Sequence, residues 1–394
     1  MISEVVLRSH ADKRLKQGYP WLYSNEIDNH KTPLSSFVPG QLVCIRGHHL
    51  EAIATGYINP HSLIAVRVIS LDPQQFLDEA LIETRLADAL RLRNCFFKKP
   101  YYRLVYSEGD FLPGLIVDRF GDHLVIQLNT AGMEAQKEII KNVLIKLLNP
   151  LSILVRNTSS IRQLENMSAY TAPLFNQPPA FVEIEENGVL FQVPLLEGQK
   201  TGWFYDHRSS RALLADYVLD KSVLDVFSYI GGFGIQAAVQ GACEVTCIDS
   251  SQAALTQVKV NAKLNGVEKK INVLCEDVFD ALTELKNKNN LFDVVMVDPP
   301  AFIKKRKDMD KGIQAYLRLN SLAMKLVKPR GILFSASCSM HLSKEKMLMM
   351  LQKAALRSKK TLQILMQNHP GQDHPLHPLL SEMDYLKGFV MEVH

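Results

Sequence analysis

The segment from Val223 to Gly234 is the feature that most constrains the fold of this chain. It reads VLDVFSYIGGFG, which is a short apolar run, a turn rich in small residues and glycine, and the start of a helical run. Glycines let the atoms of a ligand approach the backbone, and a helix N-terminus offers free N–H groups. The turn lacks the G-x-G-x-x-G pattern of dinucleotide sites. The segment therefore predicts a strand–turn–helix unit for another nucleotide-like ligand.

The rest of the C-terminal half alternates apolar strands with amphipathic helical runs, as a parallel sheet with crossover helices requires. Six further strands are expected, at residues 244–249, 271–277, 292–300, 331–339, 361–368 and 385–393. Only a loop rich in Pro and His joins the last two, which favours an antiparallel return. The sequence thus predicts an α/β fold with a seven-stranded, Rossmann-like sheet.

Chemically active side chains come where the expected strands end. Asp225, Asp249, Asp277 and Asp298 follow four strands, and Cys338 follows the fifth. Ligands of doubly wound sheets lie beyond the carboxyl ends of the strands. A single carboxylate there is more simply a helix N-cap. Four of them in register predict a ligand site.

The pattern D-x-F-x-x-x-G-G-F in the turn resembles the S-adenosylmethionine (SAM) loop of class I methyltransferases. With this cofactor, Asp249 is expected at the ribose hydroxyls, Asp277 at the adenine amino group and Asp225 near the methionine ammonium. The residues of the sheet expected to contact SAM are Asp225, Phe227, Ser228, Tyr229, Gly231, Gly232, Phe233, Asp249, Ser250, Asp277, Val278, Asp298 and Pro299.

The segment EGQKTGWFYDHRSSRALL at residues 197–214 precedes the first strand of this sheet. It follows a hairpin at residues 182–195, within the lead-in at 181–200, and its glycines, aromatics and charges suit a loop that folds over a ligand. We expect Phe204 to stack on adenine, and Arg208 and Asp206 to hold the methionine carboxylate and ammonium. The alternative is a linker whose polar residues cap the next helix.

The upstream half of the chain predicts two further domains, which gives three in all: residues 1–72, 73–180 and 181–394. The first contains the alternating runs QLVCIRG, AIATGYI and LIAVRVI, which predict an all-β module. The second predicts an α+β domain with a helix at 74–98, a hairpin at 114–128, a helix near 133–148 and a strand at 152–157. The helix carries Arg85, Arg91 and Arg93, expected on a solvated or RNA-facing side.

Charge and aromatic residues point to RNA as a partner. The net charge of +4 is compatible with nucleic acid, and a basic run directly follows DPPAFI at the end of the fourth strand. Basic and aromatic residues also lie side by side near the N-terminus, where they suit base stacking or core packing. The expected RNA-contacting residues are Lys304, Lys305, Arg306, Lys307, Arg14 and Trp21.

Cysteine usage and hydropathy predict a cytoplasmic protein without a metal site. The six cysteines form no C-x-x-C pair and no zinc spacing. The N-terminus lacks the apolar core of a signal peptide, and no apolar run is long enough to span a membrane. No membrane partner is therefore expected.

The motifs QKTGWFYDHR, VLDVFSYIGGFG, DPPAF and SCS together resemble the bacterial RlmI family. These SAM-dependent methyltransferases make 5-methylcytosine in large-subunit ribosomal RNA. The resemblance covers the whole chain and implies an N-terminal PUA-like RNA-binding domain, a central α+β domain and a homodimer. Ile230 and Trp203 depart from the family pattern, which has Thr and Phe or Tyr there. Neither position supplies a polar group to the chemistry.

The chemistry of cytosine methylation requires a thiol and an acid on neighbouring strand ends. Cytosine C5 is not nucleophilic enough to attack a sulfonium methyl. A thiolate that adds to C6 makes C5 enamine-like, and a carboxyl group at N3 stabilises the developing charge. The sequence predicts Cys338 as this nucleophile and Asp298 as this acid.

Two alternatives remain open. DPP followed by an aromatic also resembles the motif of methyltransferases that act on exocyclic amines, which need no cysteine and make N-methyl guanine or adenine. A SAM-binding ribosome-assembly factor without turnover is the second alternative. The variant Cys338→Ala would leave an amine methyltransferase active.

Overall fold

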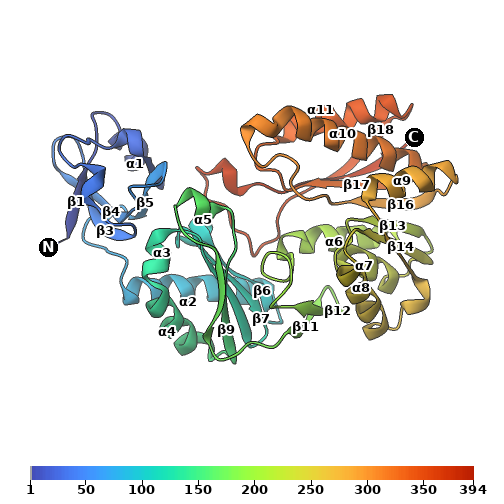
Figure 1. Cartoon of the computed structure of the whole chain (residues 1–394), viewed down its shortest axis with the longest axis horizontal. Helices are drawn as coiled ribbons and strands as arrows, with labels where there is room; N and C mark the ends of the chain where they lie inside the picture. Colours follow the sequence, from blue (N-terminus) through green and yellow to red (C-terminus); the bar gives the residue numbers. More distant parts are fainter. Residues whose placement is uncertain (1) are drawn as a thin grey trace. The chain divides into compact units, whose positions relative to one another are not determined.

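The computed structural model describes residues 2–394, and the chain forms two compact units (Figure 1). Unit 1 comprises Met1–Val182, Pro194–Tyr205 and Gln372–Ser381. Unit 2 comprises Glu183–Val193, Asp206–Gly371 and Glu382–His394. The chain therefore passes between the units more than once.

Unit 1 begins with a five-stranded sheet in the order β1-β3-β4-β5-β2. The strands are β1 (Ser3–Val6), β2 (Trp21–Tyr23), β3 (Gln41–Arg46), β4 (Ala52–Ile58) and β5 (Ile64–Ser70), with the short helix α1 (Asp12–Lys16) between β1 and β2. The three strands expected from the sequence are confirmed as β3, β4 and β5. The sequence prediction missed β1 and β2, because three or four residues are too few to show an alternating pattern.

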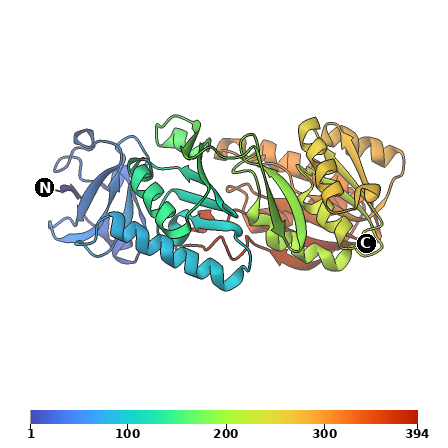
Figure 2. The ribbon, with the colours of Figure 1, turned by 90° about the horizontal axis from the view of Figure 1, so that it is seen from below.

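A second sheet of unit 1 has the order β10-β9-β8-β7-β6. Its strands are β6 (Tyr101–Tyr106), β7 (Leu115–Phe120), β8 (His123–Leu128), β9 (Ser152–Asn157) and β10 (Tyr170–Phe175), and its helices are α2 (Glu79–Phe96), α3 (Ala131–Ala135), α4 (Lys137–Leu148) and α5 (Ile161–Leu164). The long helix α2 runs along this sheet beside α4 (Figure 2). The α+β prediction is confirmed, although β6 and β10 were missed.

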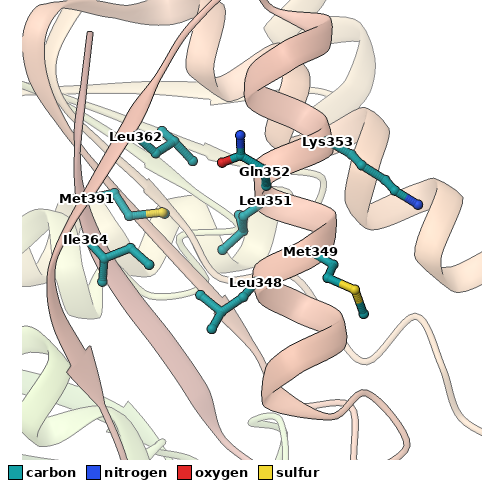
Figure 3. Close-up of a pocket in the computed structure, with 8 residues that line it drawn as sticks. All are labelled: Leu348, Met349, Leu351, Gln352, Lys353, Leu362, Ile364 and Met391. Atoms are coloured by element: carbon teal, nitrogen blue, oxygen red, sulfur yellow. The ribbon is translucent and has the colours of Figure 1, made fainter.

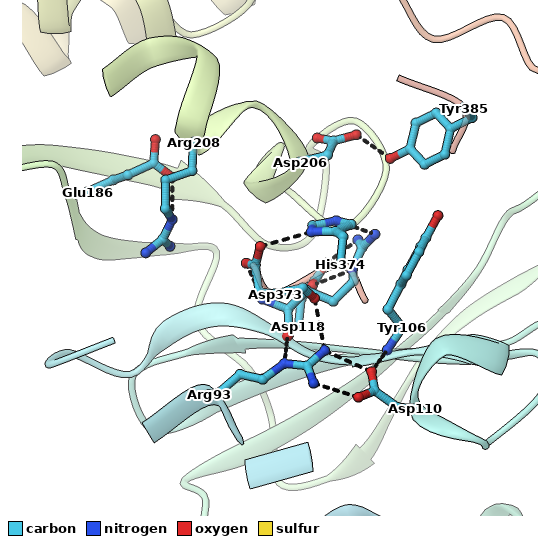
Figure 4. Close-up of polar contacts among 11 residues, drawn as sticks. Arg93, Tyr106, Asp110, Asp118, Glu186, Asp206, Arg208, Asp373, His374 and Tyr385 are labelled. Carbon is cyan, nitrogen blue, oxygen red and sulfur yellow. Dashed lines mark hydrogen bonds and ion pairs between the residues drawn. The ribbon is translucent and has the colours of Figure 1, made fainter. Parts of the chain in front are cut away.

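The helix α2 corrects the prediction for its arginines. It begins at Glu79 rather than at residue 74, because the Asp78 side chain accepts a hydrogen bond from Leu81 N and caps it. Arg93 is fully buried and binds both carboxylate oxygens of Asp110, at 2.5 and 2.7 Å (Figure 4). Arg93 is therefore neither solvated nor RNA-facing.

Arg85 also turns inward, since its guanidinium donates to the carbonyls of Phe111 and Ile69. Only Arg91 of the three is exposed, with a loose ion pair of 3.7 Å to Asp88.

Unit 2 contains the seven-stranded sheet that the sequence predicts, in the order β15-β14-β13-β16-β17-β19-β18. Its strands are β13 (Ser222–Val226), β14 (Glu244–Asp249), β15 (Ile271–Cys275), β16 (Phe292–Val297), β17 (Val327–Ser337), β18 (Leu362–Asn368) and β19 (Lys387–Val393). The last strand, β19, is antiparallel to both of its neighbours, as expected. It enters between the fifth and sixth strands. A separate hairpin pairs β11 (Phe181–Glu186) with β12 (Val189–Pro194).

Helices cover both faces of this sheet (Figure 1). One layer holds α6 (Arg208–Leu214), α7 (Gly232–Val239) and α8 (Gln252–Leu264); the other holds α9 (Val278–Asn287), α10 (Met309–Leu326) and α11 (Lys344–Arg357). The apolar core of the second layer packs side chains such as Val295, Leu319 and Met350 at or near zero exposure. The sheet is thus rigid where its strands end.

No helix in the described part of the chain, residues 2–394, is long and apolar enough to cross a membrane.

Candidate active site

Five polar side chains come at the carboxyl ends of five neighbouring parallel strands of unit 2. Across the sheet, from β15 to β17, they are Asp277, Asp249, Asp225, Asp298 and Cys338. The pairing of β15, β14, β13, β16 and β17 is parallel throughout. The fold therefore brings the predicted site residues to one edge, which we call the carboxylate edge.

Asp225 is a buried acid with little to neutralise it. Its Oδ2 accepts a hydrogen bond of 2.8 Å from Gly234 N. The pKa of Asp225 is raised to about 7, chiefly by burial and also by the neighbouring Asp298 and Asp249 carboxylates, while the hydrogen bond from Gly234 opposes this rise. Within residues 2–394, no lysine or arginine lies in ion-pair distance of Asp225. This position favours a cationic ligand.

Asp249 shapes the turn that follows β13. Its Oδ2 accepts from Tyr229 N and its Oδ1 from Ser251 N, both at 2.9 Å. Tyr229 and Phe227 adopt positive φ angles of 50° and 65°, a strained region for side-chain-bearing residues. A carboxylate oxygen has a second lone pair, so Asp249 keeps acceptor capacity for a ligand hydroxyl.

The glycines of the turn allow close backbone approach. Gly231 has a φ of 84° and precedes α7 as its N-cap. A Cβ at Gly234 would lie 2.7 Å from Cys247 Sγ and 3.0 Å from Asp225 Oδ2. Gly232 begins α7, whose first N–H groups lie at the carboxylate edge. The turn therefore fits a nucleoside ligand that carries positive charge.

Asp277 is the N-cap of α9. Its Oδ1 accepts from Phe279 N at 2.9 Å and from Asp280 N at 3.4 Å. The residue is exposed, as is Ser250, whereas Val278 is buried in the first turn of α9. The simpler interpretation of one carboxylate, a helix cap, thus holds for Asp277, and its contact with adenine stays a prediction.

The two residues predicted to hold the methionine part of SAM both have polar partners within the chain (Figure 4). Asp206 is buried and accepts a hydrogen bond from the Tyr385 hydroxyl. Arg208 Nε lies 3.5 Å from Glu186 Oε2, and Arg211 binds the other oxygen of Glu186 at 2.6 Å. Sequence reasoning did not predict these partners, and contact of Asp206 and Arg208 with SAM stays a prediction.

The predicted aromatic contacts differ in their surroundings. Phe204 belongs to unit 1, where Lys200 Nζ lies 4.3 Å from the centre of its ring. Phe233 is buried, with its ring 5.4 Å from that of Phe334. Phe227 is half-buried at the carboxylate edge, with its ring 6.5 Å from Phe302. Contact of each ring with SAM stays a prediction.

Cys338 lies in a rigid frame of hydroxyl groups. Ser337 Oγ donates to the Tyr316 hydroxyl at 2.8 Å, and Ser339 Oγ lies 2.8 Å from the same hydroxyl. Ser339 Oγ also accepts from Ile303 N at 3.2 Å. Both serines are fully buried, whereas Cys338 is half-buried. The sequence S-C-S thus fixes the backbone on both sides of a thiol that remains accessible.

Cys338 and Asp298 follow adjacent parallel strands. β16 and β17 pair with Val297 opposite Ser335. Cys338 Sγ lies 3.9 Å from the carbonyl oxygen of Pro299, the residue after Asp298. The predicted thiol and the predicted acid are therefore brought together.

His207 is a partner of Asp298 that sequence reasoning missed. Its Nε2 lies 3.1 Å from Asp298 Oδ2, and its side chain is only 3% exposed. The segment YDHRSS carries this histidine between Asp206 and Arg208, but no local pattern shows that it faces Asp298.

Lys387 is a second missed residue near the thiol. It lies opposite Ser337 on β19, and its Nζ donates to the Ser339 carbonyl at 3.1 Å. Burial lowers the pKa of Lys387, while the Asp384 and Cys338 anions raise it. No motif marks this lysine, because antiparallel pairing of β19 brings it to Cys338.

The predicted RNA-contacting residues fall into two groups. Lys304, Lys305, Arg306 and Lys307 are all exposed just before α10, and within residues 2–394 none of them makes an ion pair. In unit 1, Arg14 lies over the Tyr19 ring at 3.9 Å and remains exposed.

Trp21 is in contact with two charged side chains of unit 1. Its Nε1 donates to Glu108 at 2.7 Å, and the Arg67 guanidinium lies 4.9 Å from the ring centre. These contacts favour core packing of Trp21 over base stacking.

An apolar groove of about 490 Å³ in unit 2 lies apart from this chemistry (Figure 3). Leu348 and Leu351 of α11 line it together with Leu362 and Ile364, near the start of β18. Leu362 and Gly331 both pair with Val393, at the opposite end of β17 from Cys338. The groove is therefore not part of the candidate active site.

Comparisons with known proteins agree with the geometry of the carboxylate edge. Residues 164–363 match the family model of S-adenosylmethionine-dependent methyltransferases, and residues 5–71 match that of PUA-like domains. The chain belongs to the SAM-dependent methyltransferases, and SAM is its cofactor.

The family within this class follows from a full-length relative. The ribosomal RNA large subunit methyltransferase I of Aliivibrio fischeri is 36% identical over 400 residues, which cover 100% of both chains. The chain is a member of the ribosomal RNA large subunit methyltransferase I family.

Solved structures share the fold over the whole chain. A methyltransferase crystallised with SAH has a TM-score of 0.85 at 21% identity and is covered, like this chain, to 100%. A chain from Streptococcus mutans, assigned as a SAM-dependent methyltransferase, gives 0.83 at 21% identity with the same coverage.

Proposed function

We propose that this protein methylates C5 of a cytosine in large-subunit ribosomal RNA, through a covalent adduct of Cys338. The observation that carries the proposal is that an accessible thiol and an acid follow the adjacent parallel strands β17 and β16. Cys338 Sγ lies 3.9 Å from the carbonyl oxygen of Pro299, the residue after Asp298. The name of the Aliivibrio fischeri relative supports the choice of ribosomal RNA.

In the proposed reaction, Cys338 attacks C6 of the cytosine as a thiolate. The addition makes C5 electron-rich, and Asp298 stabilises the charge that develops at N3. Bound SAM supplies the methyl group as an electrophilic sulfonium. Loss of the C5 proton then reverses the addition and frees Cys338. The hydroxyl frame around Ser337 and Ser339 keeps the thiol in place through these steps.

The carboxylate edge supports specific roles toward the cofactor. We assign Asp225 to the positive methionine end, because it is a buried acid without an ion-pair partner in residues 2–394. We assign Asp249 to the ribose hydroxyls, because it ends β14 and keeps acceptor capacity. The backbone of residues 228–233 would form a wall of the SAM site, Asp277 would contact the adenine, and Ser250, Val278 and Pro299 would also contact the cofactor.

We also propose where the substrate RNA binds. The four basic residues at 304–307 directly follow the DPPAF motif, so phosphates held there would place a neighbouring base at Cys338. Arg14 in the PUA-like domain provides a second exposed cation. Neutralised phosphates release counterions, so binding at these residues would weaken steeply with salt.

The organisation of the whole protein is part of the proposal. We place domain boundaries after residues 72 and 180, because β5 ends at Ser70 and β11 begins at Phe181. A ribosomal RNA substrate places the protein in the cytoplasm, and the sequence resemblance implies a homodimer. A mass measurement in solution would test the dimer.

The direct test is nucleoside mass spectrometry of large-subunit ribosomal RNA, free or in particles, after incubation with protein and SAM. Wild type should yield 5-methylcytosine, and Cys338→Ala should yield none while it binds SAM with unchanged affinity. Cys275→Ala, at an exposed cysteine that ends β15, is the matched control and should stay active.

Two outcomes would overturn this proposal. An N-methylated guanine or adenine made by Cys338→Ala would establish the exocyclic-amine alternative. No product from wild type on either form of the RNA would favour the assembly factor.

A further inference from the structure

Both ring nitrogens of His207 are engaged at the candidate active site. Nε2 lies 3.1 Å from Asp298 Oδ2, and Nδ1 lies 3.3 Å from Ser210 Oγ. Ser210 Oγ itself accepts a hydrogen bond from Asn368 Nδ2. The hydroxyl therefore keeps its own hydrogen for the histidine. A serine hydroxyl can donate or accept, so this partner suits both the neutral and the charged imidazole.

Packing fixes the orientation of the His207 ring. The ring meets Phe233 edge-on, with 5.5 Å between centroids and an interplanar angle of 69°. Phe233 in turn packs on Phe334 of β17. His207 also directly precedes α6, which begins at Arg208. Because the ring cannot turn away, its Nε2 stays directed at Asp298.

The proposed chemistry needs a proton that a carboxylate alone does not have. An ordinary carboxyl group is ionised at neutral pH and cannot donate to N3 of cytosine. An imidazole changes its protonation near neutral pH and can donate. We propose that His207 is a positioning residue that orients Asp298 and supplies the proton which Asp298 passes to N3. This inference rests on the proposed function.

The proton balance closes over the reaction. As the C6–S bond forms, Asp298 gives a proton to N3 and receives one from the His207 imidazolium, which becomes neutral. When the C6–S bond breaks, the N3 proton returns along the same path and recharges His207. The C5 proton leaves to solvent, and the methyl group takes its place. His207 and Asp298 therefore finish as they began.

The other charged groups around this pair are few. The Asp298 carboxylate raises the pKa of Asp225, and Arg211 of α6 lowers it. The Arg211 guanidinium lies 5.7 Å from the centre of the Phe233 ring and is bound to Glu186. Arg211 and Glu186 form an ion pair with each other, whereas His207 contacts Asp298 directly.

The test uses exchange of the cytosine C5 hydrogen with solvent in the absence of SAM. In this partial reaction Cys338 adds to C6, C5 takes a proton from solvent and loses its original hydrogen, and the C6–S bond then breaks. Wild type should give a bell-shaped pH profile, whose rising limb depends on Cys338 and whose falling limb depends on His207. His207→Gln keeps an N–H donor for Asp298 but no titrating group. Its exchange should fall about 100-fold at the optimum, without the falling limb.

Controls separate this inference from the proposed function. His369→Gln removes the histidine of an exposed His–Asp pair with Asp384 and should leave the profile unchanged. SAM affinity, measured by calorimetry, should be the same in wild type and His207→Gln. If His207→Gln does not fold, Ser210→Ala removes the Nδ1 partner and should shift the falling limb.

An exchange rate equal to that of wild type, with an intact falling limb, in His207→Gln would overturn the role of His207 but not the proposed function. If only Ser210→Ala folds, the same result in that variant would do so. Loss of SAM affinity in parallel with exchange would make His207 merely structural. Exchange that persists in Cys338→Ala would instead contradict the proposed function.

Discussion

The buried acids of unit 1 and the acids of the carboxylate edge in unit 2 differ in their counter-ions. In unit 1, Asp110 is bound by Arg93, Asp118 by Arg103 at 2.8 Å, and Glu108 by Arg67 at 2.7 Å. In unit 2, Asp225 and Asp249 at the carboxylate edge make no ion pair within residues 2–394, and Asp298 has only His207.

This difference separates structural charge from functional charge. A buried carboxylate without a counter-ion destabilises the fold, so a protein retains it where a ligand completes it. The arginines of unit 1 are the counter-ions of its buried carboxylates. In the proposed function, the sulfonium and ammonium groups of SAM would provide the positive charge at the carboxylate edge.

The largest expected effect concerns stability in unit 1. Asp110→Ala would leave the Arg93 guanidinium buried without its bidentate partner, which typically costs about 3–5 kcal/mol. Urea unfolding would measure the loss. Asp88→Ala, which breaks the exposed pair with Arg91, is the control and should cost less than about 0.5 kcal/mol. Equal losses of unfolding free energy in the two variants would contradict the structural role of the Arg93–Asp110 pair.

Asp225 should make the stability of unit 2 depend on pH. Its pKa is raised from 3.8 to about 7 in the folded protein, so the folded state holds this proton more tightly than the unfolded state. The contribution to stability is therefore full below pH 4 and is lost as the pH rises through 7, by about 3–4 kcal/mol.

Asp225→Asn removes the titrating group and should flatten this part of the profile. Urea unfolding of both proteins between pH 4 and 8 would measure the difference. Profiles of the same slope would show that Asp225 is compensated within the chain, like the acids of unit 1.

A smaller effect is expected on the cofactor. Asp249→Asn should weaken SAM binding by about 1–3 kcal/mol, because a polar partner of the ribose is lost. Calorimetry would measure it, with Asp280→Asn in the first turn of α9 as the control. An unchanged affinity for SAM would contradict the assignment of Asp249 to the ribose hydroxyls.

The smallest effect on stability is expected at residues 304–307. Replacing Lys304 and Lys305 by Ala should change the unfolding free energy by less than about 0.5 kcal/mol, because both are exposed. The slope of log affinity for RNA against log salt should fall by about 0.7–0.9 for each phosphate that the variant no longer neutralises. An unchanged slope would place the RNA elsewhere.

The sheet of unit 2 could be predicted from the sequence because its signals are local. β14 and its Asp249 were predicted to the residue, since an apolar run, an acid and a helical run follow one another in the chain. Asp225, Asp277 and Asp298 were placed at strand ends for the same reason. Periodicity alone was sufficient for this part of the fold.

The partners of these residues could not be predicted, because they are distant in sequence. Arg93 looked solvated on its helix, yet it binds Asp110 and the carbonyl of Asp373, which lie 17 and 280 residues away. Asp206 accepts a hydrogen bond from Tyr385, which lies 179 residues away, and its contact with SAM stays a prediction. The proposed role of His207 depends on its contact with Asp298, which no local pattern in the sequence reveals.

The most direct test of the account is a covalent trap at Cys338. Large-subunit ribosomal RNA that carries 5-fluorocytosine lacks the C5 proton that must leave, so the adduct cannot collapse after methyl transfer. Wild type with SAM should form a protein–RNA band that survives denaturation, and Cys338→Ala should form none. A band of equal strength from Cys338→Ala, or full methylation of unmodified RNA by that variant, would contradict the account.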